Sequence, residues 1–233
     1  MLNKKLLTIS MCVILVGGAW YLLSQDQVDQ VSKSFWRNQE VWDYSKVMPM
    51  RAQIFEKFIQ EQIIPTLSKS DIVGELGSAS GEYTLKVAPY AKKIEAFEIS
   101  KKMVDSAKKL AENQNIKNVV FNCSSAEEVT LEPNVYDKFL CLGLFTCIPS
   151  DKSVKKIINN MYTSLKPGGV LFIKDSVTSG GTVKHNDGNY AAIYRNEKEY
   201  FDCFSDKFDI EYKSYIADNG NYKSVVAVLR RKS

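Results

Sequence analysis

The chain has 233 residues, 45% of them hydrophobic and 25% charged, and this ordinary globular composition excludes a disordered or fibrous protein. The net charge of +4 comes from 31 basic and 27 acidic residues spread along the chain, so no nucleic-acid partner is indicated. One histidine and no CxxC pair leave no metal site to expect.

The first 24 residues differ from the rest. After Lys4 and Lys5, the stretch Leu6–Leu23 carries no charge over 18 residues, which is close to the length of a membrane-spanning helix. We therefore expect an N-terminal hydrophobic helix that anchors the protein in a membrane. A cleaved signal or targeting peptide remains the alternative, with Gly17-Gly18-Ala19 as its candidate cleavage site. Basic residues flank the stretch equally on both sides, so its orientation stays open.

Residues 25–48 are polar with scattered aromatic side chains, and we expect a linker and a cap over a domain that spans residues 49–233. Within that domain, segments of strand and helix type alternate. Strands are expected at 72–76, 94–99, 119–122, 136–142, 170–174, 208–216 and 223–229. Helices are expected at 53–67, 83–87 and 197–204, and after the capping residues Ser100 and Ser150.

This alternation predicts an α/β fold, a doubly wound and mostly parallel sheet with helices on both faces. The last two strands are joined by Asp218-Asn219-Gly220-Asn221, and Asn-Gly is typical of a tight hairpin. We therefore expect the final strand to run antiparallel to its neighbours.

The turn after the first strand carries the clearest functional signal. It reads Glu75-Leu76-Gly77-Ser78-Ala79-Ser80-Gly81, and its small residues let a ligand approach the backbone. Glu98 ends the second strand, where an acid can accept hydrogen bonds from both hydroxyls of a ribose. Neither the dinucleotide pattern GxGxxG nor the triphosphate pattern GxxxxGK[ST] is present. The pattern therefore predicts a nucleoside ligand of another kind.

These motifs resemble those of the class I S-adenosylmethionine-dependent methyltransferases, over about residues 50–230. The acid and glycine turn of that family are similar to Glu75 through Gly81, with Ala79 in place of the usual middle glycine. Ser125-Ala126 is similar to the pair beside the adenine, although Ser125 replaces the usual acid. The resemblance implies seven strands in the order 3214576, with strand seven antiparallel.

The resemblance also implies S-adenosylmethionine as the cofactor. The residues that it places at this cofactor are Glu75, Gly77, Ser78, Ala79, Gly81, Glu98, Ile99, Ser125, Ala126, Leu142 and Gly143. The implied activity is methyl transfer to an N or O nucleophile of a small-molecule or protein acceptor. Orientation can supply most of the catalysis, and a general base is needed only where the nucleophile arrives protonated.

The catalytic candidates follow the fifth strand. Asp175 lies at the strand end that is expected to face the ligand, and His185 is the single histidine, able to act as a base near neutral pH. Asp187 and Arg195 can clamp a polar substrate or pair with each other. Three aromatic residues of the cap can form a lid or pack in the core: Trp36, Trp42 and Tyr44.

Three alternatives remain open. Ile173-Lys174-Asp175, with Asp187 and Arg195, partly resembles the protein N-terminal α-amine methyltransferases, whose Gly-Met-Leu-Gly-Gly lid signature is absent here. A membrane-tethered nucleoside-binding protein without catalysis would explain the departures at Ala79 and Ser125. A nucleoside-dependent oxidoreductase is the third. Because a charged sulfonium does not cross hydrocarbon unaided, we expect the domain to face the cytosol or an organelle matrix.

Overall fold

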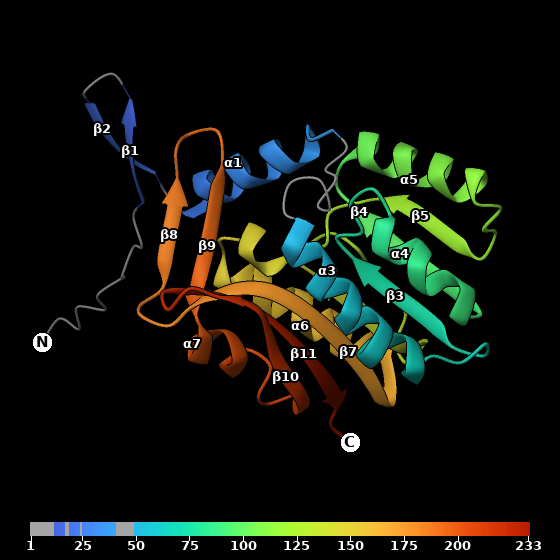
Figure 1. Cartoon of the computed structure of the whole chain (residues 1–233). Coiled ribbons are helices and arrows are strands. Elements are labelled where there is room, and N and C mark those ends of the chain that lie inside the picture. The colour runs from blue at the N-terminus through green and yellow to red at the C-terminus, as the bar shows by residue number, and fades with distance from the viewer. Residues whose placement is uncertain (1–11, 17–18, 24, 41–48) are drawn as a thin grey trace, which may run out of the picture.

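The computed structural model describes residues 12–16, 19–23, 25–40 and 49–233, and a twisted β-sheet with helices on both faces forms its centre (Figure 1). The strands of the main path are β3 (Ile72–Leu76), β4 (Lys93–Glu98), β5 (Val119–Cys123), β6 (Tyr136–Leu142), β7 (Leu165–Thr178), β10 (Phe208–Asp218) and β11 (Tyr222–Arg231). They are arranged in the order β10-β11-β7-β6-β3-β4-β5. On this path β11 alone runs opposite to the direction of the other strands. Numbered along the chain, this is the order 3214576 with strand seven antiparallel, so the predicted fold class is confirmed.

Helices cover the sheet from both sides. They are α3 (Pro49–Phe58), α4 (Glu82–Val87), α5 (Lys101–Asn113), α6 (Asp151–Ser164) and α7 (Glu197–Asp202). In Figure 1, α3 and α4 lie in front of the sheet and α6 lies behind it. Phe55 and Phe58 of α3 pack with Leu140 and Phe172 in one hydrophobic cluster, and α6 and α7 pack with Ile173 in a second. A third, smaller cluster packs α5 against β4 and β5.

Helix boundaries follow local sequence signals. The hydroxyl oxygen of Ser100 accepts the amide of Met103 at 3.2 Å, and Ser150 accepts the amide of Ser153 at 3.3 Å, as expected for N-caps. The helix expected from residue 53 begins at Pro49, because proline is well tolerated in a first turn whose amides have no helical partner. It continues as a π-helical segment (Ile59–Ile63) and a 3₁₀ turn (Ile64–Thr66).

Two segments that we expected to be irregular are regular. Residues 25–37, expected as a linker, form the helix α1 (Gln25–Arg37). The polar loop after the fifth strand forms a hairpin of β8 (Val183–Asn186) and β9 (Ala191–Asn196). Because Ala191, Ala192 and Ile193 are buried, β9 packs on the domain and pairs in parallel with the end of β7. Figure 1 shows this hairpin rising beside α1.

The N-terminal segment also differs from expectation. Within Leu6–Leu23, the described residues form two antiparallel strands, β1 (Cys12–Val16) and β2 (Ala19–Leu23), so the prediction of a helix is wrong for them. Valine and isoleucine, which are stiff at their branched Cβ, favour strands and make up most of β1. Among the described residues, none of the helices has the length and apolar character needed to cross a bilayer. Trp42 and Tyr44, the other candidate lid residues, lie outside the described residues.

Candidate active site at the carboxyl ends of the strands

A cavity of about 640 Å³ opens where β3, β4, β6 and β7 end. Ligands of open α/β sheets bind at this edge, and the volume is that of a small-molecule site. The turn after β3 and the segment after β5 contribute one set of lining residues, and α3, β9 and the β10–β11 turn contribute another. Helix α1 contacts both regions, since Lys33 pairs with Glu127, after β5, and Trp36 contacts Tyr190, before β9. We call the part lined by the first set the cofactor half, and the part lined by the second set the acceptor half.

The glycine turn adopts a backbone that few side chains tolerate. Gly77, Ala79 and Gly81 all have positive φ, at 77°, 47° and 78°. This left-handed conformation costs an L-residue about 1–2 kcal/mol, so Ala79 is strained where a glycine would not be. The amide of Gly77 donates to the carbonyl of Phe97 at 2.8 Å, which fixes the turn to the end of β4.

Two serine hydroxyls of this turn are buried and make no hydrogen bond among the described residues. They belong to Ser78 and Ser80, which both line the cavity and are nearly inaccessible. A buried polar group without a partner is costly. The turn therefore has the donors and acceptors that a polar cofactor would satisfy.

Two buried carboxyl groups face the same half of the cavity. Glu75 is 2% exposed and accepts the hydroxyl of Thr84 at 2.7 Å; its burial raises the pKa of this carboxyl to about 7. Glu98 accepts the amides of Ala79 at 3.0 Å and Ser100 at 2.9 Å. Burial also raises the pKa of Glu98, although these backbone hydrogen bonds oppose the shift. Carboxyl groups here suit a ligand with ribose hydroxyls and a cationic centre.

Most of the residues expected at the cofactor line this cavity. They are Glu75, Gly77, Ser78, Ala79, Glu98, Ile99, Ser125, Ala126, Leu142 and Gly143. Gly81 does not line it. A Cβ there would lie 2.9 Å from the Cβ of Ala107 and 3.0 Å from the ring of Phe121, so Gly81 lets the turn approach α5 and β5.

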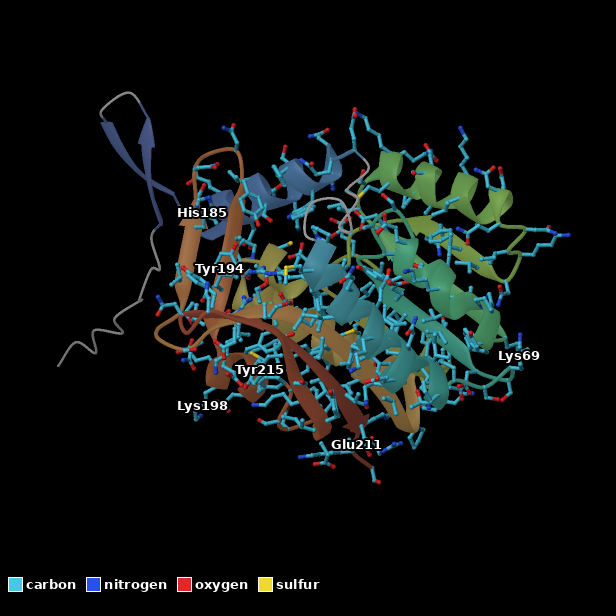
Figure 2. The ribbon with its side chains drawn as sticks, viewed as in Figure 1. Lys69, His185, Tyr194, Lys198, Glu211 and Tyr215 are labelled. Carbon is cyan, nitrogen blue, oxygen red and sulfur yellow. The ribbon has the colours of Figure 1, made fainter. Side chains whose placement is uncertain are left out.

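The two catalytic candidates have different surroundings. Asp175 lines the cavity and is 2% exposed, but its carboxylate accepts the amides of Phe145 at 2.8 Å, Thr146 at 3.1 Å and Ser176 at 2.9 Å, and also the Thr146 hydroxyl. His185 does not line the cavity. It lies on β8, half exposed, with Nε2 at 3.6 Å from Asp187 (Figure 2). The structure thus brings Asp175 to the site and leaves His185 on the outer strand.

Asp187 and Arg195, which we expected either to clamp a polar substrate or to pair with each other, do not pair among the described contacts. Arg195 is 4% exposed and pairs with Asp151, whose Oδ1 lies 2.9 Å from Nε and 2.8 Å from Nη2. Asp187 instead accepts the amides of Asn189 and Tyr190 within its own turn. Neither residue lines the cavity.

Aromatic side chains dominate the acceptor half. Trp36 contacts Tyr190 edge-to-face at 6.3 Å between ring centres, and Tyr194 contacts Tyr222 at 5.4 Å. Figure 2 shows Tyr194 on β9. We name these four residues the aromatic wall. Tyr222 was not among the predicted site residues, yet the predicted topology contains its signal, because an antiparallel last strand must begin where the parallel strands end.

Among the described residues, four cationic side chains line the cavity: Lys33, Arg51, Lys174 and Lys223. Lys33 pairs with Glu127, and Lys223 pairs with Glu197. Lys174 lies on β7 beside Asp175, and Arg51 lies on α3. Burial lowers the pKa of Lys174, and the nearby charge of Arg51 acts in the same direction. The opposite charge of Asp175 partly offsets both effects. Neither Arg51 nor Lys174 was predicted as a site residue, because Arg51 lies 123 positions before Lys174 in the chain and only the fold brings them to one cavity.

Comparisons with known proteins agree with this geometry. A family model described as a methyltransferase domain matches residues 67–224. Phosphoethanolamine N-methyltransferase 1 of Triticum aestivum is 27% identical over 215 residues, which cover 87% of this chain and 42% of that protein. The chain thus spans less than half of this relative, and it spans 51% of a second curated one, a putative methyltransferase of Dictyostelium discoideum.

Solved structures share the fold. A Haemonchus contortus phosphoethanolamine N-methyltransferase 1, bound to phosphoethanolamine and S-adenosylhomocysteine, superposes with a TM-score of 0.73 at 17% identity. The superposition covers 90% of this chain and 50% of that one. A complex of DhpI with S-adenosylhomocysteine gives 0.69 at 14% identity, covering 89% and 98%. S-Adenosylmethionine is the cofactor of this family, and the unpartnered Ser78 and Ser80 hydroxyls beside Glu98 fit such a group. The chain belongs to the class I S-adenosylmethionine-dependent methyltransferases.

Proposed function

We propose that the protein transfers a methyl group from S-adenosylmethionine to the nitrogen of a small-molecule amine held in the acceptor half of the cavity. The observation that carries this proposal is the aromatic wall, which lines the same cavity as the buried carboxyl groups. Aromatic faces attract ammonium-type cations by about 0.5–2 kcal/mol each, more strongly when water is excluded. Such a wall suits an amine and the more highly methylated product equally well.

We assign the residues of the cofactor half to different parts of the cofactor. When bound, the cofactor supplies an electrophilic methyl group on a sulfonium. In this proposal Glu98 would accept ribose hydroxyls, Ser125 and Ala126 would flank the adenine, and the hydroxyls of Ser78 and Ser80 would gain partners; all of them line the cavity. In-line transfer then depends on how well the two halves hold the nitrogen and the methyl carbon in line, which can lower the barrier by several kcal/mol.

We propose further that the amine carries an anionic group, as phosphoethanolamine does. Arg51 and Lys174 place two positive charges at one end of the acceptor half, and an anion there would offset the cost of burying the Lys174 ammonium. The carboxylate of Glu82 also lines the cavity, as do Lys33 and Lys223, which pair with Glu127 and Glu197. The names of the wheat and Haemonchus relatives support the same class of acceptor.

Asp175 and His185 have other roles in this proposal. Four donors of its own chain already occupy the Asp175 carboxylate, so we assign it to holding the backbone after β6. His185 lies outside the cavity and takes no part in the transfer. Neither residue acts as the general base, so the bound ammonium loses its proton to water before the neutral nitrogen attacks the methyl carbon and S-adenosylhomocysteine leaves.

A methylation assay on the full chain tests the proposal. With labelled S-adenosylmethionine, phosphoethanolamine should be methylated well above ethanolamine. Methylation of the N-terminal amine of a peptide instead would favour the protein α-amine alternative, and cofactor binding without turnover on either class would favour a binding protein. Tyr194→Leu should raise the KM of the amine about tenfold, as loss of one desolvated cation–π contact implies. Tyr215→Leu, which removes an aromatic ring on β10 outside the cavity, is the matched control (Figure 2).

We also propose that residues 1–24 attach the protein to a membrane, with the domain in a compartment that contains the cofactor, the cytosol or an organelle matrix. The uncharged stretch Leu6–Leu23 supports this, and α1, the first helix lining the cavity, starts only at Gln25. Protease treatment of sealed membranes that carry a C-terminally tagged protein tests it. We expect the protease to remove the C-terminal tag when it is added on the side of the membrane that contains the cofactor. A tag that stays protected from protease on that side until the membrane is permeabilised would show the opposite orientation.

A further inference from the structure

The segment between β6 and α6 forms a wall shared by both halves of the cavity. Residues 143–148, here called the β6–α6 turn, contribute Gly143, Leu144, Thr146, Cys147 and Ile148 to the lining. The turn contains a short 3₁₀ helix (Phe145–Cys147), and a single turn of this kind is held weakly by its own hydrogen bonds. Contacts from other elements must therefore fix its position.

Those contacts come from three directions. Asp175 on β7 accepts the turn's amides at Phe145 and Thr146, as described above. The hydroxyl of Ser32 on α1 donates to the carbonyl of Cys147 at 2.6 Å. Arg195 on β9 donates from Nη1 to the carbonyl of Phe145 at 2.9 Å and from Nη2 to that of Ile148 at 3.0 Å.

Arg195 links this turn to the aromatic wall through a single strand. Successive side chains of a strand point to opposite faces. On β9, Tyr194 faces the cavity, and its neighbour Arg195 is buried against the turn. Arg195 therefore joins the turn, through a planar, charged group, to the strand that presents Tyr194. A lysine could not reproduce this link, because it lacks the fork of donors in fixed geometry.

We propose that Arg195 is a positioning residue that couples the cofactor half to the acceptor half, so that cofactor binding orders the β8–β9 hairpin for the acceptor. The inference rests on the proposed function, since it takes the aromatic wall as the acceptor site. Arg195 touches neither ligand in this scheme. Its role is to make the positions of Tyr190 and Tyr194 depend on the position of the β6–α6 turn.

Hydrogen exchange in the full chain tests the coupling without any acceptor. S-Adenosylhomocysteine should slow amide exchange in the turn and also, about tenfold, in residues 191–196 of the hairpin. In Arg195→Lys, protection of the turn should persist, S-adenosylhomocysteine affinity should change less than about threefold, and protection of the hairpin should be lost. Arg231→Lys is the matched control, because Arg231 also donates to a backbone carbonyl, that of Leu165, but lies away from the cavity.

The possible outcomes distinguish a failure of the proposed coupling from a failure of the proposed methyltransferase function. If the hairpin is protected equally in the parent and in Arg195→Lys, or is never protected although S-adenosylhomocysteine binds, the coupling is overturned and the proposed function stands. If S-adenosylhomocysteine fails to bind the parent chain, both are overturned. An unfolded Arg195→Lys, seen by circular dichroism, would make the residue structural. Asp151→Asn then decides, because it weakens the ion pair between Arg195 and the exposed Asp151 and leaves the Arg195 donors to both carbonyls in place. Unchanged hairpin protection in this variant supports the carbonyl link, and lost protection contradicts it.

Discussion

Ala79 occupies a backbone position that suits glycine, and Ala79→Gly should therefore stabilise the protein. Its φ of 47° costs an L-residue about 1–2 kcal/mol. Glycine removes this cost but loses about 0.5–1 kcal/mol through the greater freedom of the unfolded chain. The net gain should be about 0.5–1 kcal/mol, equivalent to a rise of about 1–4 °C in Tm for a domain of this size. The amide that donates to Glu98 is unchanged, so cofactor affinity should not fall.

Calorimetric melting of the parent, Ala79→Gly and a control measures this effect. Ala88→Gly removes the same methyl group from a residue with a φ of −52°, where alanine is unstrained, and it should lower the Tm. Opposite signs for the two variants are the expected result. A lower Tm for Ala79→Gly would refute the strain argument, because the methyl group would then contribute more by packing than the backbone loses.

Three other changes test the site. Glu98→Ala should weaken S-adenosylmethionine binding by about 1.5–3 kcal/mol, roughly 10- to 150-fold by calorimetry, and Glu95→Ala on the same strand outside the cavity should not. Folding raises the pKa of the Glu75 carboxyl from 4.5 to about 7. Its contribution to the free energy of unfolding is therefore complete below about pH 4.5 and is lost as the pH rises through about 7. Glu75→Gln should flatten this part of the dependence of stability on pH, which urea titrations can measure. Deletion of residues 1–24 should preserve folding and cofactor affinity, whereas deletion of residues 1–40 removes Ser32 and the ion pair between Lys33 and Glu127 and should weaken affinity.

The sheet could be predicted from the sequence because its signals are local. Short apolar strands alternate with capped helices, and Asn219-Gly220 marks the hairpin that reverses the last strand. The residues of the cofactor half could also be predicted from the sequence, because the residues that follow each parallel strand lie at the same edge of the sheet. Glu75 and Glu98 meet there for this reason.

The acceptor half depends on contacts between distant segments, which carry no local signal. Arg51 and Tyr222 enter the cavity from α3 and β11, and only the packed fold brings them together. The hairpin of β8 and β9 was not predicted, because the burial of β9 comes from distant segments, α1 and the end of β7. Asp175 was correctly expected at the cavity, but its chemistry is set by the amides of Phe145 and Thr146, which lie about 30 positions earlier.

Calorimetric titration of the full chain with S-adenosylmethionine, in the presence of a metal chelator, is the most direct measurement of what this cavity binds. We predict one bound molecule per chain, comparable binding of S-adenosylhomocysteine, no binding of NAD, and a 10- to 150-fold loss in Glu98→Ala. Absence of heat with S-adenosylmethionine, binding of NAD instead, or an unchanged affinity in Glu98→Ala would contradict the assignment of the turn after β3 and of Glu98 to the cofactor.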